Sequence, residues 1–404
     1  MHVLDHLMAR GFLQTHTDLD ALKAHMDAGP VTFYVGFDPT ADSLHIGHLL
    51  PVMAMAWLQE AGHRPLAIVG GGTGLIGDPS GKSKTREMLD EAAIQRNLEA
   101  QKGQLKRFLR LADTADSAAD GEGLVLNNAD WLTPLNYIAF LRDIGRHFSV
   151  NRMLTAEGMR QRIDRNQGLS FVEFNYHLLQ SYDFLVLNQQ HGCTLQLGGD
   201  DQWFNILGGV DLIRRVESVS AHALTVPLIM TADGKKMGKT EAGAVFLDAA
   251  QVSPYDYHQY WLNVHDADVG RMLRLYTKLP IGEIEPLEAL DGPQIRVAKA
   301  RLAWEATALV HGAAEADKAR DAAAKAFSGG VSADMPTITA ALPAPVVELL
   351  VQAELASSKS EARRFVKGGG VRIDDDKVSD IGATLDHPAV LWRGKKKAVR
   401  VVEG

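Results

Sequence analysis

Hydrophobic positions near the start of the chain change from an extended to a helical spacing and back again. Residues 31–36 are rich in β-branched and aromatic side chains, which predicts a strand. Residues 46–61 have a strongly apolar face at helical spacing, and Pro51 stands early enough to be tolerated in the first turn. Residues 65–69 form a second apolar run that enters a glycine-rich turn. Strand, helix and strand in this order predict the βαβ unit of a parallel sheet.

The remaining pattern predicts an α/β fold followed by a helical segment and a small terminal unit. The further predicted elements are a polar helix at about 83–111, a surface loop at 113–123, a strand at 124–126, helices up to about 187, a strand at 194–197 and an apolar run at 225–230. Residues 253–327 are helical in pattern, residues 328–345 are rich in Gly, Ala and Pro and predict a linker, and residues 346–404 predict a separate α+β unit.

Composition narrows the class of protein. The 404 residues are 46 % hydrophobic and 23 % charged, as in ordinary globular proteins, and are enough for two or three domains. The single cysteine, Cys193, excludes an internal disulfide and a cysteine-rich zinc site, and it suits a reducing cytoplasm. The sequence contains neither a secretory signal pattern nor an uninterrupted apolar stretch of about 20 residues, so we expect no membrane span.

Charge is distributed unevenly along the chain. The formal net charge is -8, which argues against nonspecific coating of nucleic acid. Residues 359–404 carry eleven Lys/Arg and seven Asp/Glu, so this tail is +4 while the rest of the chain is -12. Such asymmetry suggests a nucleic-acid contact near the C-terminus, although on charge alone a solvated surface is the favoured explanation.

Two short basic motifs stand far apart in the sequence. His45-Ile46-Gly47-His48 opens the helix predicted at 46–61, and its two rings share one helix face. The pair could begin a metal site, but no third ligand is spaced to complete it. It could be two exposed histidines, or it could bind phosphate at a helix N-terminus. Lys236-Met237-Gly238-Lys239-Thr240 is either a solvated basic loop or a mobile one that closes over phosphates.

The glycine turn after residue 69 resembles two nucleotide-binding motifs without matching either. Gly72 to Gly77 follows the pattern G-x-G-x-x-G, but Pro79 and Gly81 stand where a dinucleotide-binding helix would already run. Gly81-Lys82-Ser83 resembles the end of a Walker loop, but its earlier glycine is at the wrong spacing. We therefore expect a turn that lets the backbone approach a ligand, with Asp78 at its rim.

Five motifs in order carry a family resemblance. They are the segment 34–40 that reads YVGFDPT, the HIGH tetrapeptide, GDPSGKS at 77–83, QLGGDDQW at 196–203 and the KMGKT loop. Together they resemble bacterial tyrosyl-tRNA synthetases, which are class I aminoacyl-tRNA synthetases. The resemblance covers nearly the whole chain. It implies a Rossmann-like catalytic domain at 1–230, the KMGKT loop with an α-helical domain at 231–330, a linker at 331–345 and a small RNA-binding domain at 346–404.

The resemblance also implies a role for individual residues. Tyr34 and Asp183 resemble the pair that hydrogen-bonds the phenol of tyrosine. The groups that resemble the holders of the substrate ammonium are Asp78, Tyr176 and Gln180, and Gln202 resembles the residue near the carboxylate. The residues that match the ATP-binding positions of the family are Gly36, Asp38, Gly47, Gly198, Gly199, Asp201 and Lys239. The residues that match the catalytic positions of the family are Thr40, His45 and His48. Lys82, Arg86, Lys236 and Lys239 match its mobile cations, which bind pyrophosphate.

Three residues depart from the family pattern. Val35 and Pro51 stand where some relatives carry Cys and Thr facing the ATP ribose, so we expect them to tune nucleotide affinity without abolishing activity. Asp200 stands where serine is frequent and adds negative charge near the site.

The tail shares the resemblance. Residues 353–371 resemble a small RNA-binding domain that is also found in a ribosomal small-subunit protein. Ser358 and Glu361 have capping-box spacing, which would start a helix. The cations expected to contact RNA are Lys359, Arg363, Arg364 and Lys367, with a purely solvated helix as the alternative.

The resemblance implies a tyrosine–tRNA ligase that uses ATP with Mg²⁺ and has no structural metal. Its implied partners are L-tyrosine, ATP and tRNA(Tyr), and it implies a homodimer through helices around 131–153, located in the cytoplasm. The alternatives are a tryptophanyl enzyme of the same class, a noncatalytic RNA-binding protein on the same scaffold, and a dehydrogenase. The polar Tyr34–Asp183 pair and the tail favour tyrosine, and the intact HIGH and KMGKT motifs favour an enzyme.

Overall fold

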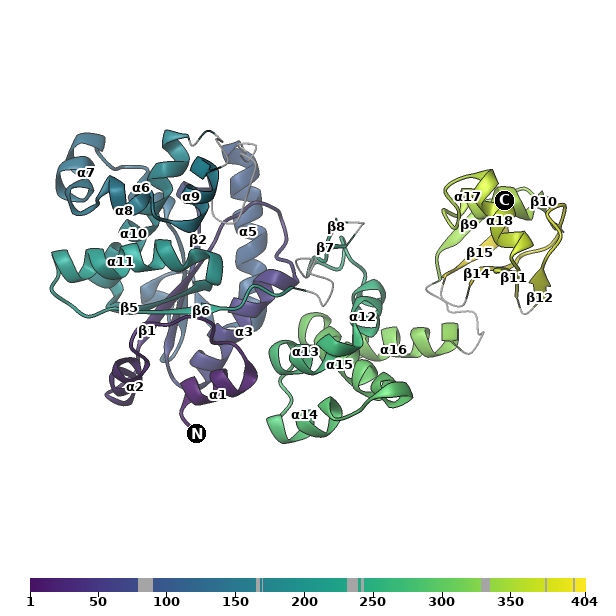
Figure 1. Ribbon diagram of the computed structural model, residues 1–404, viewed down its shortest axis with the longest axis horizontal. Helices are drawn as coiled ribbons and strands as arrows, with labels where there is room; N and C mark the ends of the chain where they lie inside the picture. The colour runs from purple at the N-terminus through teal and green to yellow at the C-terminus, as the bar shows by residue number, and fades with distance from the viewer. Residues whose placement is uncertain are drawn as a thin grey trace. The chain divides into compact units, whose positions relative to one another are not determined.

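A computed structural model describes residues 1–78, 90–164, 168, 170–230, 239–240, 243–327, 335–374, 376–394 and 397–404 (Figure 1). The chain forms two compact units. The first consists of Met1–Val252 with Val264–Ala298, and the second of Ser253–Asn263 with Lys299–Gly404.

A six-stranded parallel sheet forms the centre of the first unit, as the βαβ pattern predicts. Its order is β3-β4-β2-β1-β5-β6. The strands are β1 (Thr32–Phe37), β2 (Arg64–Val69), β3 (Leu111–Ala112), β4 (Gly123–Asn127), β5 (Cys193–Gly199) and β6 (His222–Val226). Parallel strands are covered on both faces, which explains why β2 reads as an apolar run without alternation.

The crossover helices lie in two layers because parallel crossovers are right-handed. The chain moves one way along the sheet through α3 (Ile46–Glu60) and α5 (Glu91–Phe108), and the other way through α10 (Phe171–His191) and α11 (Trp203–Val216). The two pairs therefore cover opposite faces (Figure 1). The direction changes between the neighbouring strands β1 and β5, which makes their carboxyl ends the switch point of the sheet.

Shorter helices surround this framework. They are α1 (Val3–Arg10), α2 (Leu19–Asp27), α4 (Gly71–Gly74), α6 (Ala129–Leu132), α7 (Tyr137–Asp143), α8 (Val150–Met153), α9 (Glu157–Asp164), α13 (Val269–Tyr276) and α14 (Ile281–Glu288). Two short strands, β7 (Lys239–Thr240) and β8 (Gly243–Ala244), pair with each other antiparallel. No helix of the described residues is both long and apolar enough to cross a membrane.

A buried arginine joins α1 to the segment after α13. Arg10 donates from Nη1 to the carbonyls of Arg274 at 2.6 Å and Thr277 at 3.0 Å, and from Nη2 to the carbonyl of Leu279. Its guanidinium also lies 4.5 Å from the centre of the Trp57 ring. Burial lowers the pKa of Arg10 to about 10, which leaves it charged at neutral pH. The carbonyls satisfy that buried charge, and the contacts fix α13 against α1.

The residues after α1 run antiparallel along the edge of the sheet. Gln14 N donates to Thr225 O at 2.9 Å, Thr17 N to Ala223 O at 3.1 Å, and Thr225 N to Thr15 O at 2.7 Å. Asp200 reinforces this pairing, because its Oδ1 accepts from the hydroxyls of Thr15 and Thr225, each at 2.7 Å. The N-terminal segment thus covers β6, which would otherwise be an open edge.

Several predicted boundaries shift in the structure. The polar helix predicted at 83–111 is described as α5 from Glu91 to Phe108, and the part of it before residue 90 lies outside the described residues. Only residues 225–226 of the apolar run predicted at 225–230 belong to β6, which begins earlier, at the buried His222, and ends at Val226. A polar first residue hid the start of this strand from the hydrophobic pattern.

The second unit combines three helices with a small α+β layer. The helices are α12 (Pro254–Leu262), α15 (Ile295–His311), which begins in the first unit, and α16 (Ala313–Phe327). A five-stranded sheet has the order β12-β11-β14-β15-β9, with β9 (Thr337–Ala340), β11 (Val371–Ile373), β12 (Asp376–Val378), β14 (Ala389–Arg393) and β15 (Lys397–Glu403). The helices α17 (Val346–Gln352) and α18 (Lys359–Lys367) pack with this sheet around one apolar core, beside the short pair β10 (Ala344–Pro345) and β13 (Thr384–Leu385).

The segment predicted as a linker at 331–345 contains one strand of this sheet. β9 pairs in parallel with β15, and Ile338 lies opposite Val401. The strand has only four residues between Pro- and Ala-rich flanks, so its pattern is too short to identify from the sequence. The division into domains ending at 230, 330 and 345 stays a prediction.

Candidate active site

A cleft of about 380 Å³ opens at the carboxyl ends of β1 and β5. This is the switch point where ligands of open α/β sheets bind. Predicted residues from all parts of the site line the cleft: Tyr34, Gly36, Asp38, Thr40, His45, Gly47, His48, Asp78, Tyr176, Gln180, Asp183, Gly198, Gly199, Asp201 and Gln202. The fold thus brings together side chains that are more than 160 residues apart in the sequence.

Three predicted cations, Lys82, Arg86 and Lys236, lie outside the described residues, and Lys239 is described only through its backbone in β7. The chain on each side of the KMGKT segment is described. Leu228 before it lines the cleft, and Val245 after it accepts a hydrogen bond from Ile46 N at 3.0 Å. The chain before the segment therefore borders the cleft, and the chain after it lies beside the HIGH tetrapeptide.

Two stacked histidines start α3 at the cleft. His45 Nδ1 accepts from Gly47 N at 3.0 Å and from His48 N at 3.4 Å, while His48 Nδ1 accepts from His45 N at 3.3 Å. The rings are 3.8 Å apart. Because Nδ1 accepts in both rings, the proton of each neutral ring is on Nε2. A helix N-terminus with two such N–H donors favours an anion.

Gly47 is required by this arrangement. A Cβ atom at this position would lie 2.9 Å from Cε1 of His45. Such a contact is too short for carbon atoms, so any larger residue would displace the His45 ring from its cap.

Carboxylates gather at the centre of the cleft. Asp38 accepts from the Tyr176 hydroxyl at 3.1 Å and from the Thr73 hydroxyl at 3.0 Å. Gln202 Nε2 donates to Asp78 Oδ2 at 2.7 Å. Burial, and then the nearby charges of Asp38 and Asp78, raise the pKa of Tyr176 well above its ordinary value. The same charges favour a cation bound beside Tyr176.

One face of α10 carries the polar residues of the cleft. Tyr176, Gln180 and Asp183 stand at i, i+4 and i+7, and all three line the cleft as this spacing predicts. The helix begins with a capping box, in which Ser170 Oγ accepts from Glu173 N at 3.1 Å and Glu173 Oε2 from Ser170 N at 3.2 Å.

Asp183 lies in the interior with two side-chain donors. Asn128 Nδ2 donates to its Oδ2 at 3.0 Å, and Trp131 Nε1 to its Oδ1 at 2.7 Å. Burial raises the pKa of Asp183 to about 7, and the two hydrogen bonds act in the opposite direction. Near neutral pH the carboxyl group can therefore exist in both protonation states.

Tyr34 presents a hydroxyl without a partner. Its side chain is only 2 % exposed, and its Oη makes no hydrogen bond within the described part of the chain. Burial, and then the charge of Asp183, raise the pKa of Tyr34 well above its ordinary value. A buried polar atom without a partner is costly, and its position in a cleft indicates that a ligand supplies the partner.

Sequence reasoning missed the residues that support Asp183. Asn128 accepts from Gly72 N at 2.8 Å, donates to the Thr73 hydroxyl at 3.0 Å and donates to Asp183, so it joins the glycine turn to α10. Asn128 and Trp131 follow the carboxyl end of β4. Polar residues directly after a buried parallel strand are the signal that could have identified them.

The three residues that depart from the family pattern lie in two different places. Val35 and Pro51 line the cleft. The carboxylate of Asp200 instead accepts hydrogen bonds from the hydroxyls of Thr15 and Thr225 at the sheet edge, where it stabilises the fold.

The predicted RNA-binding cations are on α18 of the second unit. Lys359, Arg363, Arg364 and Lys367 are all exposed. Ser358 caps the helix by accepting from Glu361 N at 3.2 Å. Lys359 forms an ion pair with Glu348 at 2.6 Å, while Arg363 and Lys367 stand one turn apart on the same helix face.

No group of three or more His, Cys, Asp or Glu side chains in the described ranges is arranged to hold a metal ion.

Asp183 should make protein stability depend on pH. A carboxyl group with a pKa of about 7 in the fold and 3.8 in the unfolded chain binds its proton more tightly when folded. Its stabilising effect is full below pH 3.8 and is lost as the pH rises through 7, by up to about 1.4 kcal/mol per pH unit. Denaturant titrations between pH 5 and 7 should show this slope in the wild type and a shallower one in Asp183→Asn. Parallel profiles would contradict the raised pKa.

Comparison with known proteins places both parts of the chain in one group. The family described as tRNA synthetases class I (W and Y) matches residues 26–328, and the tyrosine–tRNA ligase SYY-like C-terminal domain matches residues 327–401. A tyrosine–tRNA ligase of Clostridium botulinum (strain Alaska E43 / Type E3) is 48 % identical over 98 % of this chain and 98 % of its own. A tyrosine–tRNA ligase of Clostridium kluyveri is 49 % identical over 99 % of both chains.

Solved structures agree on the fold. The C-terminally truncated mitochondrial tyrosyl-tRNA synthetase of Aspergillus nidulans superposes with a TM-score of 0.70 at 30 % identity, over 79 % of this chain and 92 % of its own. A tryptophanyl-tRNA synthetase of Encephalitozoon cuniculi reaches a TM-score of 0.55 at 14 % identity, over 78 % of this chain and 87 % of its own. The fold alone therefore does not separate tyrosine from tryptophan, whereas the sequence matches do.

Proposed function

The chain belongs to the tyrosine–tRNA ligase family of the class I tRNA synthetases, and from this premise we propose that the cleft between β1 and β5 activates L-tyrosine with ATP and transfers it to tRNA. The unpartnered Tyr34 hydroxyl beside Asp183 carries the assignment. The phenol of tyrosine would accept from one of these groups and donate to the other. A tryptophan side chain has no hydroxyl for this position.

The polar groups along the cleft fit the two ends of the amino acid. The ammonium group would lie between Asp78, Tyr176 and Gln180, where the carboxylates favour a cation. Gln202 donates one amide N–H to Asp78, and its second N–H can donate to the substrate carboxylate. This arrangement would hold the carboxylate towards the HIGH tetrapeptide.

ATP would occupy the other half of the cleft. Gly36, Gly198 and Gly199 border the cleft with backbone alone, and Asp38 and Asp201 offer carboxylates for a ribose. Thr40, His45 and His48 lie where the helix N-terminus favours the triphosphate. The cations Lys82, Arg86, Lys236 and Lys239 would join them as the glycine turn and the KMGKT segment contact the pyrophosphate.

The first step needs no nucleophile from the protein. The tyrosine carboxylate attacks the α-phosphorus of ATP in line, the bond to the β-phosphate oxygen breaks, and pyrophosphate leaves with its Mg²⁺. Holding both reactants in line supplies up to about 7–11 kcal/mol in favourable cases. The His45 and His48 N–H groups stabilise charge that builds up on the phosphate oxygens. In the second step a terminal ribose hydroxyl of tRNA attacks the adenylate carbonyl and AMP leaves.

ATP–pyrophosphate exchange with each amino acid separately tests this function. We expect exchange with tyrosine alone, and charging of tRNA(Tyr) with tyrosine. Exchange with tryptophan would identify the other enzyme of this class. Absence of exchange with every amino acid would favour a noncatalytic RNA-binding protein, and nicotinamide binding without exchange would favour a dehydrogenase.

We also propose a homodimer through the helices around 131–153, which lie beside α10 (Figure 1). These helices and the start of α10 expose large apolar side chains: Tyr137, Ile138, Leu141, Val150, Phe171 and Val172. Several exposed large apolar side chains on neighbouring helices are typical of a protein interface. The proposal places the protein in the cytoplasm, where tRNA is charged.

Ile138→Asp should shift the protein towards monomers. The Ile138 side chain is 71 % exposed, so a charge there leaves the fold intact but would have to be desolvated in an interface. Light scattering after size exclusion should give the mass of one chain for Ile138→Asp at concentrations where the wild type has twice that mass. Val297→Asp, at a position 60 % exposed on α15, is the matched control and should stay dimeric. A dimeric Ile138→Asp would exclude this interface.

Arg363→Glu with Lys367→Glu should impair the tRNA step selectively. The two side chains share an exposed face of α18, and reversing a charge that binds a phosphate weakens RNA binding and flattens its dependence on salt. We expect kcat/KM for tRNA in aminoacylation to fall about tenfold or more, with exchange unchanged because tRNA takes no part in it. Equal rates of aminoacylation for variant and wild type would show that α18 does not contact RNA.

A further inference from the structure

Adjacent residues of α10 face two different cavities. Tyr176 faces the active-site cleft, while His177 lines a separate cavity of about 60 Å³ between α8, α10 and α11. Neighbouring residues of a helix point about 100° apart, so this division follows from the helical geometry. His177, Ser181 and Phe184 form a second face of α10 that packs against α11.

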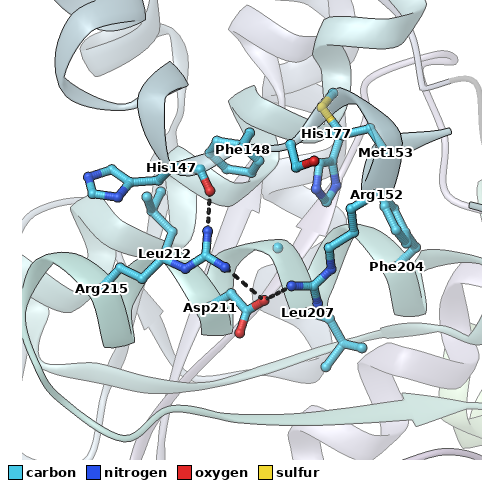
Figure 2. Close-up of a pocket in the computed structure, with 12 residues that line it drawn as sticks. His147, Phe148, Arg152, Met153, His177, Phe204, Leu207, Asp211, Leu212 and Arg215 are labelled. Atoms are coloured by element: carbon cyan, nitrogen blue, oxygen red, sulfur yellow. Dashed lines mark hydrogen bonds and ion pairs between the residues drawn. The ribbon is translucent and has the colours of Figure 1, made fainter. Parts of the chain in front are cut away.

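The His177 ring is held rigidly. It is only 6 % exposed and lies between Phe148 and Phe204, with ring centres 5.4 Å and 4.5 Å away (Figure 2). A Cβ at Gly208 would lie 2.3 Å from its Cε1, so only glycine fits opposite the ring. On the other side of the cavity, Asp211 pairs with Arg152 (Figure 2). The imidazole therefore has little freedom to rotate.

A directed series of hydrogen bonds runs from this ring to the cleft. Gln202 Nε2 donates to Asp78 Oδ2 at 2.7 Å, and its Oε1 accepts from Asn205 Nδ2 at 3.2 Å. The Oδ1 of Asn205 lies 3.2 Å from Nδ1 of His177. Since Nδ2 of Asn205 already donates, its Oδ1 must accept, so His177 carries the proton on Nδ1. Burial lowers the pKa of His177 to about 4, which keeps the ring neutral at the pH of the reaction.

We infer that His177 and Asn205 are positioning residues that orient the amide of Gln202 towards the carboxylate of tyrosine. Neither lines the active-site cleft. His177 fixes which way the Asn205 amide faces, and Asn205 then fixes the Gln202 amide with its nitrogen towards Asp78 and the cleft. Resting on the proposed function, this inference adds two residues that no cleft contact would identify.

The opposite orientation of Gln202 would oppose binding. Its oxygen would then face the carboxylate of Asp78 and the carboxylate of the substrate, and neither can donate a proton to it. The two orientations have nearly the same shape, so packing alone does not choose between them. Hydrogen bonding from Asn205 makes the choice, and it depends on the donor at His177.

Asn205→Asp removes the donor to Gln202 without changing the volume of the side chain. We expect KM for tyrosine in ATP–pyrophosphate exchange to rise about tenfold, with KM for ATP unchanged within about twofold. Asn188→Asp is the matched control. It makes the same chemical change on the same framework, where Asn188 Nδ2 donates to the carbonyl of Cys193, and it should leave both KM values unchanged.

Two replacements of His177 separate orientation from packing. His177→Asn puts a side-chain N–H where Nδ1 stands and should keep KM for tyrosine within about threefold of the wild type. His177→Leu fills the space without a donor and should raise KM for tyrosine as Asn205→Asp does. The double variant His177→Leu/Asn205→Asp should have the same KM for tyrosine as Asn205→Asp alone, because both changes break the same series of hydrogen bonds to Gln202.

Gln202→Ala distinguishes failure of this inference from failure of the proposed site. If Gln202→Ala raises KM for tyrosine but Asn205→Asp and His177→Leu do not, the positioning role is excluded and the site stands. If Gln202→Ala has no effect either, the site assignment fails as well. An equal rise in KM for tyrosine and ATP, together with a thermal midpoint lowered by more than about 5 °C, would show a purely structural role and overturn the inference.

Discussion

Replacing Asp183 with alanine should lower kcat/KM for tyrosine in ATP–pyrophosphate exchange by about 100-fold or more. The variant loses the proposed partner of the substrate phenol and also leaves the N–H groups of Asn128 and Trp131 without their acceptor. Phenylalanine has no hydroxyl and loses much less. Preference for tyrosine over phenylalanine should therefore decrease, by a principle for which tyrosyl-tRNA synthetases are the standard example.

Two further variants separate the contributions to this effect. Tyr34→Phe removes one hydroxyl and should reduce the preference for tyrosine while leaving exchange with phenylalanine almost unchanged. Asn128→Ala keeps the carboxylate but removes one of its donors, so it should weaken tyrosine binding less than Asp183→Ala does. An unchanged preference in both Asp183→Ala and Tyr34→Phe would refute the placement of the phenol at this end of the cleft.

His45→Asn should lower kcat for tyrosine activation by about 100-fold and leave KM for tyrosine within about threefold. An asparagine oxygen can accept from the amides of Gly47 and His48 as Nδ1 does, so the start of α3 remains capped. The variant lacks the Nε2–H donor, which in the proposed mechanism acts on the triphosphate as charge develops. An interaction made mainly in the transition state affects kcat and not substrate affinity.

His45→Ala provides the comparison. It loses both the cap and the donor, so it should match His45→Asn in kcat but unfold at a lower denaturant concentration, with a loss of about 1 kcal/mol. Pre-steady-state measurement of adenylate formation gives the rate directly. If tyrosine affinity and activation rate fall by the same factor in His45→Asn, the ring acts in ground-state binding.

The sequence was most informative where residues serve both local structure and chemistry. The apolar pattern of 46–61 predicted α3, and the two histidines of the HIGH tetrapeptide cap its start. Tyr176, Gln180 and Asp183, which the resemblance named, line the cleft from one face of α10 because they stand at i, i+4 and i+7. The parallel sheet followed from apolar strands separated by helices, since buried strands need no alternation. These features depend on short-range spacing, which a single sequence contains.

Features that depend on distant contacts could not be predicted. Asn128 supports Asp183 across a separation of 55 residues, and nothing in its own neighbourhood indicates that partner. The carboxylate of Asp200, expected to add charge near the site, is bound by Thr15 and Thr225 because the N-terminal segment returns to the sheet edge. In the sequence, nothing distinguishes His177 from the other residues of its helix, because its hydrogen-bond partner Asn205 is 28 residues away.

The pairing of residues 14–17 with β6 also affects how the chain avoids self-association. An uncovered outer strand offers its unpaired amides and carbonyls to any other extended chain, and such edges are common starting points for aggregation. At the opposite end of the sheet, β3 has only two residues and offers little backbone for a foreign strand. Residues 14–17, which do not line the cleft, would thus keep the folded protein from adding a strand of a neighbouring chain at this edge.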